Sequence, residues 1–164
     1  MRSGPLLRRL LRLPVLLYRC RLGWLLGHRF LLLTHVGRRT GRVHRTVLEV
    51  LDYDVGSGTA VVMAGFGRRS DWYQNLQARP ALKVVIGRRA FPPAQRELAE
   101  QEAVTVLAGY ERRNRLLAPV LRAVLGRLVG WPYDGSEAAR RRLVNERPLV
   151  AFSPAADRSG GSGS

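Results

Sequence analysis

The sequence contains a single cysteine, Cys20, among its 164 residues. One cysteine cannot form an internal disulfide, and no second cysteine or histidine stands near it at metal-ligand spacing. The three histidines, His28, His35 and His44, do not form a ligand pair, because the alternation around His35 predicts a strand and His28 lies in a Gly-Arg turn. The sequence therefore disfavours a disulfide scaffold and a metal site, and a reducing cytoplasm is expected.

The N-terminal segment lacks an uncharged apolar run of the roughly 20 residues that a transmembrane helix needs. Arginines interrupt its leucines, and no small-residue cleavage site follows, which argues against a signal peptide. We interpret residues 1–29 as a basic amphipathic helix kinked at Pro14. Two roles compete for it: packing its leucines on the domain, or lying on an anionic membrane surface through residues 5–27. The second role would place a cytoplasmic protein peripherally on the inner face of the cell membrane.

Aromatic residues make up only 7% of the chain, and Lys83 is the single lysine among 28 basic residues. The formal charge of +16 nevertheless points to nucleic acid, an anionic surface or a polyanionic ligand. A nucleic-acid module is disfavoured, because the arginines are not interleaved with the aromatic side chains of a stacking platform. The near-absence of lysine also indicates that base composition of the genome contributes to the arginine content.

The length allows one domain, which we place at residues 30–157, followed by a flexible tail or tag remnant at 158–164. Strands are predicted at 30–36, 43–53, 59–64, 82–86, 89–98 and 149–152. Helices are predicted at 72–78, with Asp71 as N-cap, at 100–111 and 116–128, and from a Ser136 cap to about residue 145. Short antiparallel strands with helices packed outside favour an α+β barrel over a Rossmann sheet.

A basic turn joins the first two predicted strands, where residues 37–45 read Gly-Arg-Arg-Thr-Gly-Arg-Val-His-Arg. The glycines permit a tight turn with exposed amides, and Thr40 adds a hydroxyl donor. Arginine side chains can fork onto phosphate or carboxylate oxygens; those available are Arg38, Arg39, Arg42 and Arg45. The turn is not a P-loop, because it lacks the Gly-Lys-Ser/Thr ending and opens into a strand. It predicts anion binding, with a solvated hairpin turn as the alternative.

A second motif follows the third strand, where residues 64–76 read Ala-Gly-Phe-Gly-Arg-Arg-Ser-Asp-Trp-Tyr-Gln-Asn-Leu, with Arg79-Pro80 shortly after. Together with the basic turn, in this order and spacing, the segment resembles the deazaflavin (F420)-dependent nitroreductase family, a branch of the split β-barrel flavin-binding fold. The resemblance covers about residues 30–98 and extends more loosely to the strand near Leu149. It implies a split β-barrel with flanking helices.

The resemblance also implies a cofactor, coenzyme F420, and the residues that would bind it. In such proteins the basic turn holds the phosphate and the polyglutamate tail, a role that falls here to Arg38, Arg39, Thr40 and Arg45. His44 and Arg45 stand where relatives often carry Pro-Arg or Arg-Arg, so either can reach the phosphate. The deazaflavin ring would be lined by Val47, Leu48 and Glu49 and by the loop of Ala64, Gly65, Phe66 and Gly67. Trp72 and Asn75 would close the pocket, although aromatic residues there also suit core packing.

The implied activity is hydride transfer between reduced deazaflavin and a lipophilic acceptor: a quinone, activated alkene, nitro compound or fatty acyl chain. We expect the acceptor to be lipophilic because the leucines at 116–128 oppose arginines and could cover an apolar pocket. The proton donor is left open between Tyr73, Tyr110, Tyr133 and Glu49, so no residue is assigned as catalytic. Alternatives are a split barrel that binds FMN or haem, and a non-catalytic carrier of deazaflavin or lipid. Split barrels often form homodimers, which are compatible with this sequence.

Overall fold

The structure is a computed structural model that describes residues 27–156. The predicted N-terminal amphipathic helix and the glycine–serine tail therefore lie outside the described residues. No helix within 27–156 is long and apolar enough to cross a membrane.

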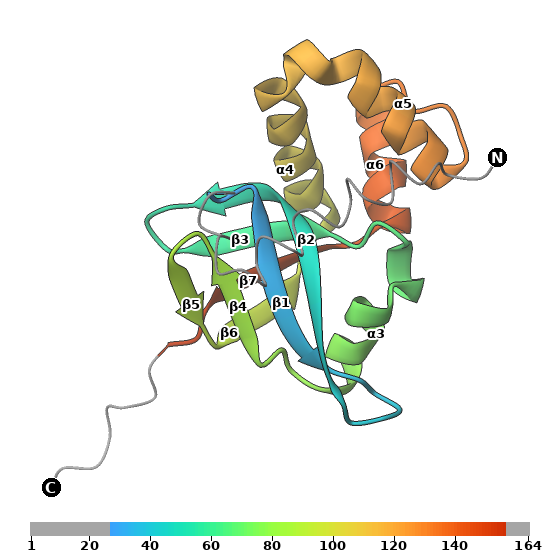
Figure 1. The fold of residues 1–164 in the computed structure, drawn as a ribbon. Coiled ribbons are helices and arrows are strands. Elements are labelled where there is room, and N and C mark those ends of the chain that lie inside the picture. Colours follow the sequence, from blue (N-terminus) through green and yellow to red (C-terminus); the bar gives the residue numbers. More distant parts are fainter. Residues whose placement is uncertain (1–26, 157–164) are drawn as a thin grey trace, which may run out of the picture.

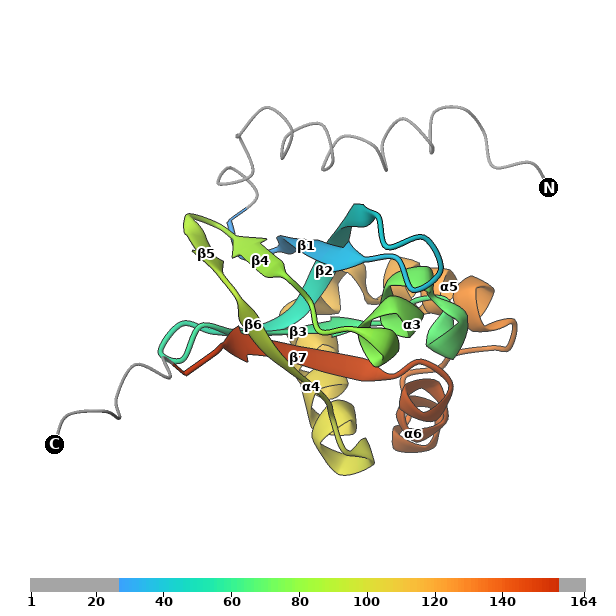
Figure 2. The same cartoon turned by 90° about the horizontal axis from the view of Figure 1, so that it is seen from below.

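Seven strands form one antiparallel sheet in the described part of the chain. In chain order they are β1 (Phe30–Val36), β2 (Val43–Asp54), β3 (Thr59–Met63), β4 (Lys83–Ile86), β5 (Arg89–Phe91), β6 (Pro93–Glu97) and β7 (Leu149–Pro154). The spatial order is β5-β4-β1-β2-β3-β7-β6, so β5 and β6 stand at opposite ends of the sheet. Pro92 alone separates these two strands in the chain, and the ribbon passes directly from one layer to the other (Figure 2). The sheet consequently curls into a split β-barrel.

One predicted strand, 89–98, is divided in two at Pro92. The proline has no N–H to continue a ladder, and the chain turns there from pairing with β4 to pairing with β7. This turn is the corner that closes the barrel.

A bulge in β2 divides the hydrophobic core into two clusters. Val50 pairs with Val62 and Asp52 with Val61, so that Leu51 is the extra residue between them. Val50 therefore faces the barrel interior while Leu51 faces the helices outside. The neighbouring strands β3 and β7 are buried on both faces, which explains their nearly continuous apolar sequences.

The helices cover one end and one side of the barrel (Figure 1). They are the short η2 (Gly67–Arg69), α3 (Asp71–Ala78), α4 (Glu100–Arg113), η3 (Arg115–Leu117), α5 (Ala118–Val129) and α6 (Glu137–Glu146). The helices α4, α5 and α6 gather over β3 and β7, whereas α3 lies beside the β1–β2 turn. The α6 helix begins at the predicted cap, with Ser136 Oγ accepting from the Ala139 amide at 3.1 Å. The α3 helix instead has Ser70 at its N-cap position, one residue before the predicted Asp71.

Candidate functional site

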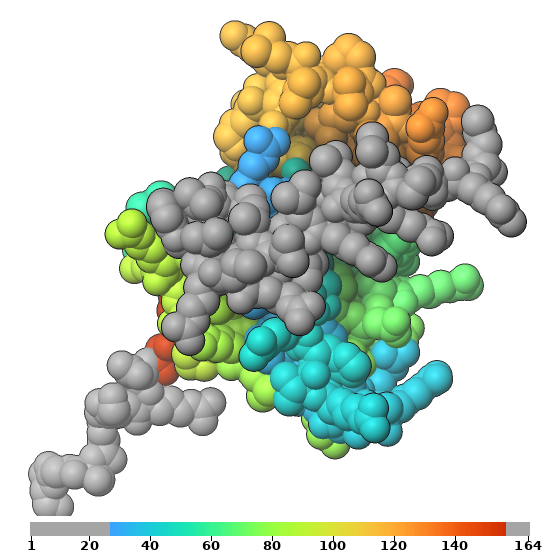
Figure 3. Space-filling model, viewed as in Figure 1, coloured from blue at the N-terminus to red at the C-terminus, as the bar shows by residue number. Residues whose placement is uncertain are grey.

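The β1–β2 turn is a compact loop that leaves its basic side chains outside. The Gly37 amide donates to the Arg42 carbonyl at 2.8 Å, and the Gly41 amide donates to the Gly37 carbonyl at 2.9 Å. Gly41 has a φ of +66°, a conformation that residues with a side chain rarely adopt. The turn projects next to α3 on the surface of the molecule (Figure 3).

Arg38 ties this turn to α3. Its backbone amide and its Nη1 both donate to Asn75 Oδ1, at 3.0 and 2.9 Å. The guanidinium also contacts Asp71 Oδ1 at 3.2 Å. Asp71 is largely exposed, so this ion pair contributes less to stability than the contacts with the buried Asn75. Arg38 thus fixes the distance between the turn and the helix.

Asn75 continues this network to His35, a histidine that is only 3% exposed. Because Asn75 Oδ1 accepts from Arg38, its Nδ2 faces His35 Nδ1 at 3.1 Å and donates to it. His35 Nε2 therefore carries the proton and donates to Thr46 Oγ1 at 3.1 Å. Burial, followed by the nearby His44, lowers the pKa of His35, which favours this neutral form.

The turn, the start of β2 and the start of α3 surround a cavity of about 520 Å³, called here the basic cavity. Eight predicted cofactor residues line it: Arg38, Arg39, Thr40, His44, Arg45, Phe66, Trp72 and Asn75. Three guanidinium groups face it, with Asp71 as the single carboxylate. The Arg39 and Arg45 side chains have no ion pair or hydrogen bond among the residues that the structure describes. These two arginines are available for an anion.

Ser70 gives the basic cavity a polar group without a protein partner. Its side chain is 4% exposed, and Ser70 Oγ makes no hydrogen bond within residues 27–156. The hydroxyl does not cap α3, although it stands at the N-cap position. A buried hydroxyl without a partner is costly, so a ligand atom that bonds to it would remove this cost. The cavity therefore suits a ligand with anionic and hydrogen-bonding groups.

The remaining predicted residues do not line the basic cavity. Val47 and Leu48 are half-buried in β2, and Glu49 Oε1 accepts from Tyr110 Oη at 2.6 Å. Ala64 is fully buried, and Gly65 lies in the loop before η2. Gly67 has a φ of +66°, and a Cβ there would lie 2.7 Å from the Glu146 carbonyl oxygen, so its glycine serves packing against α6.

The four residues considered as proton donors all participate in contacts elsewhere. Tyr73 Oη donates to Glu97 Oε2 at 2.5 Å beside Arg68, and Tyr133 Oη donates to Glu111. Tyr110 donates to Glu49, and burial raises the pKa of Tyr110 and Tyr133 well above the ordinary range. None of the four lines the basic cavity. Arg68, beside the same tyrosine, is held by Glu97 at 2.7 Å and also lies outside the residues that line the basic cavity.

Sequence reasoning did not assign several residues that line the basic cavity, namely His35, Gly37, Thr46, Ser70 and Asp71. His35 carried a usable signal, because it continues the inward alternation of Leu31 and Leu33. Ser70 carried no such signal. A serine just before a helix is normally expected to cap it, and only the structure shows that this hydroxyl does not.

Fold and site together define a class: a split β-barrel protein with a basic, ligand-sized cavity between its first hairpin and a short helix. The profile of the F420H2-dependent quinone reductase family matches residues 13–115, and the chain belongs to this family. It is therefore an oxidoreductase that uses coenzyme F420. No curated protein sequence matches the chain.

Solved structures similar to this chain include an F420H2-dependent reductase, with 18% identity, a TM-score of 0.41 and coverage of 77% of this chain and 95% of that one. Another, described as a domain-swapped dimer, has 18% identity and a TM-score of 0.41 and covers 85% and 98% of the two chains. A pyridoxamine 5′-phosphate oxidase-related, FMN-binding protein from Nostoc punctiforme has 18% identity, a TM-score of 0.44 and coverage of 93% and 81%.

Proposed function

We propose that the protein uses reduced F420 to reduce a quinone-like lipophilic acceptor, and that the basic cavity anchors the acidic part of the cofactor. The observation that carries this proposal is the pair Arg39 and Arg45, which line the cavity without partners among residues 27–156. Phosphate and carboxylate groups are the ligands that guanidinium groups bind best. The Ser70 hydroxyl also supports the proposal, because this buried group has no partner among the described residues and can bond to a polar atom of the cofactor.

Within this proposal each cavity residue has a separate task. Arg39, Arg45 and Thr40 bind the phosphate and acidic tail, whereas Arg38 positions the turn through Asn75. Phe66, which is 75% exposed, would cover the apolar part of the ligand at the cavity mouth. When bound, reduced F420 supplies the hydride, so the protein contributes orientation and charge matching.

The deazaflavin ring is proposed to extend from the basic cavity along β2, past Val47, Leu48 and Glu49, towards the loop of Ala64 and Gly65. Glu49 and its hydrogen-bond partner Tyr110 would then lie at the ring end of the site. Since Tyr110 holds its proton firmly, solvent is the simpler source of the proton that the acceptor needs.

The acceptor class is tested by steady-state oxidation of reduced F420 with menadione as a soluble quinone, and in parallel with a nitroaromatic compound, a cyclic enone and a fatty acyl ester. We expect kcat/KM to be at least tenfold higher for menadione than for the others. A larger kcat/KM for the nitroaromatic compound or the enone would assign the acceptor to that class instead.

We also propose that the protein docks on anionic membrane, where lipophilic acceptors reside. Residues 5–27 support this proposal by their basic amphipathic sequence, and the region of α5 supports it by its exposed surface. Large apolar side chains are exposed on η3 and on the first half of α5: Leu116, Leu117, Val120 and Val124. Arginines and no acidic residues accompany them within 115–130. An apolar surface with this charge fits an anionic bilayer.

Assembly into a homodimer is a further part of the proposal, and it rests on the general tendency of split barrels to dimerise. Sedimentation equilibrium of the full chain tests it directly, because a monomer at micromolar concentration would contradict it.

A further inference from the structure

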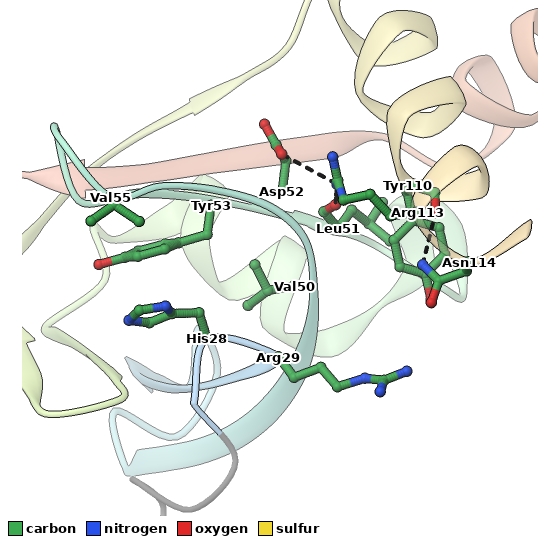
Figure 4. Close-up of a pocket in the computed structure, with 10 residues that line it drawn as sticks. All are labelled: His28, Arg29, Val50, Leu51, Asp52, Tyr53, Val55, Tyr110, Arg113 and Asn114. Carbon is green, nitrogen blue, oxygen red and sulfur yellow. Dashed lines mark hydrogen bonds and ion pairs between the residues drawn. The ribbon is translucent and has the colours of Figure 1, made fainter.

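A second cavity, of about 500 Å³, lies at the far end of β2, called here the β2-end cavity (Figure 4). It is enclosed by the second half of β2, the end of α4 and the residues just before β1. The family resemblance assigns no residue to this place, and none of the residues that line the basic cavity lines this one.

One wall of the β2-end cavity carries a stacked aromatic pair. The rings of His28 and Tyr53 stack with centroids 4.1 Å apart and planes 25° apart. Val50 and Val55 lie next to this pair, and Figure 4 shows the His28 and Tyr53 rings side by side at one end of the cavity. The outer face of either ring can pack against a planar conjugated ligand.

The opposite side of the cavity carries polar groups that the protein leaves unused. The Arg29 guanidinium has no ion pair or hydrogen bond among the described residues. By contrast, Arg113 is held by Asp52 at 3.2 Å and also donates to the Leu51 carbonyl. Asn114 uses one amide hydrogen on the Tyr110 carbonyl at 2.8 Å, so its Oδ1 and its second N–H have no partner among the described residues. An apolar cavity with a few unpaired polar groups is typical of a small-molecule site.

The β2-end cavity is also suitably placed relative to the basic cavity, because both lie along the same strand. Thr46 lines the basic cavity and Val50 lines the β2-end cavity. Four residues of strand correspond to about 13 Å at the usual rise of 3.3 Å per residue. A cofactor anchored at the basic cavity and extended along β2 would therefore bring its ring towards the β2-end cavity.

We infer that the β2-end cavity binds the electron acceptor, a planar conjugated dicarbonyl compound of the quinone class. The ring of the acceptor would lie against the His28–Tyr53 pair, and one carbonyl oxygen would accept a hydrogen bond from Arg29. Asn114 directly precedes η3, which begins the exposed apolar surface with Leu116, so an apolar tail can leave the cavity along that surface. The inference rests on the proposed function and adds the residues that select the acceptor.

The test uses the full chain, menadione as the probe and two measurements. In steady state with reduced F420, Arg29→Gln should raise the KM for menadione at least tenfold, and the Kd for F420 should stay within twofold. His28→Ala, which removes the stacked ring, should raise the same KM. Lys83→Gln, at an exposed cation of β4, is the matched control and should leave both quantities unchanged.

Menadione binding without cofactor, followed by saturation-transfer NMR, separates this inference from the proposed function. Weaker binding to Arg29→Gln and His28→Ala than to the wild type supports the acceptor site even if the wild type shows no F420-dependent turnover. Unchanged KM and unchanged menadione binding in both variants would overturn it. An equal rise in the Kd for F420 would also overturn it, because the cavity would then belong to the cofactor.

Discussion

Neighbouring arginines of the β1–β2 turn have different tasks. Arg38 points to α3 and binds Asn75 and Asp71, whereas Arg39 and Arg45 face the basic cavity without partners among residues 27–156. The sequence does not distinguish the roles of the three arginines, because nothing in the turn itself indicates where α3 will lie. Substitution of Arg38 should therefore disturb the turn as well as binding, and Arg39 and Arg45 are the cleaner positions to test.

His35 should make the free energy of unfolding depend on pH just below neutrality. Burial lowers its pKa from the ordinary 6.5, so the unfolded chain binds this proton more readily than the folded one. The stabilisation is complete above pH 6.5 and is lost as the pH falls from there through the lowered folded pKa. Urea titrations from pH 7.5 to pH 5 should show this decline in the wild type and a flatter curve in His35→Gln.

Lys83→Gln, at an exposed residue of β4, provides the control for this pH dependence and should keep the wild-type slope. Identical slopes in the wild type and His35→Gln would show that another group titrates in this range.

Ser70 should contribute to ligand binding and not to stability. Ser70→Ala removes a hydroxyl that has no partner in the described protein, so the free energy of unfolding should stay the same or rise slightly. A hydrogen bond to a charged ligand contributes about 1.5–3 kcal/mol, so the Kd for F420 should rise about 10- to 100-fold. Fluorescence titration measures the Kd, and urea unfolding measures the stability.

The matched variant for Ser70→Ala is Ser136→Ala, because Ser136 caps α6 far along the chain. It should lose about 1 kcal/mol of stability and keep its affinity for F420. The reverse result, with Ser70→Ala destabilised and its affinity unchanged, would make Ser70 a purely structural residue.

At the scale of elements, the strands could be predicted well because their apolar residues alternate. The 30–36 prediction is confirmed exactly as drawn, with Leu31 and Leu33 inside. The corner at Pro92 was missed, since the same alternation continues on both sides of it. The bulge at Leu51 was also not predicted. The consecutive apolar residues Val50 and Leu51 fit a regular strand as well as a bulged strand that faces two core clusters.

The α5 helix should provide much of the affinity for anionic vesicles. The exposed apolar surface begins in η3 with Leu116, which is 91% exposed, and continues in α5 with Val120. The double variant Leu116→Glu with Val120→Glu replaces apolar contact with the lipid by charge repulsion from it. Retention on phosphatidylglycerol vesicles should therefore fall at least tenfold. Cosedimentation at low salt measures the retention.

Val43→Glu with Leu82→Glu is the control for this prediction, because it adds the same charge at two exposed apolar residues of the barrel. Equal loss in both double variants would mean that retention follows net charge alone. Full retention in the α5 variant would show that another segment of the chain binds the lipid.

At the scale of the whole molecule, composition indicated an anionic partner and the two motifs indicated the family, and the family is confirmed. The basic cavity forms where these motifs meet, so eight of its predicted residues could be named from the sequence. The β2-end cavity could not, because its residues come from three separate segments without a shared motif. The charge of +16 further predicts that affinity for F420 falls as salt rises.

The most direct test is a titration of the full chain with F420 and with FMN, followed by tryptophan fluorescence, since Trp72 lines the basic cavity. F420 should bind with a micromolar or lower Kd that rises at least tenfold in Arg39→Gln with Arg45→Gln, while Arg79→Gln with Lys83→Gln should bind like the wild type. FMN should bind more weakly, because it offers a single phosphate to the arginines. Equal F420 affinity in the two double variants, or tighter binding of FMN than of F420, would contradict the basic cavity as the cofactor anchor.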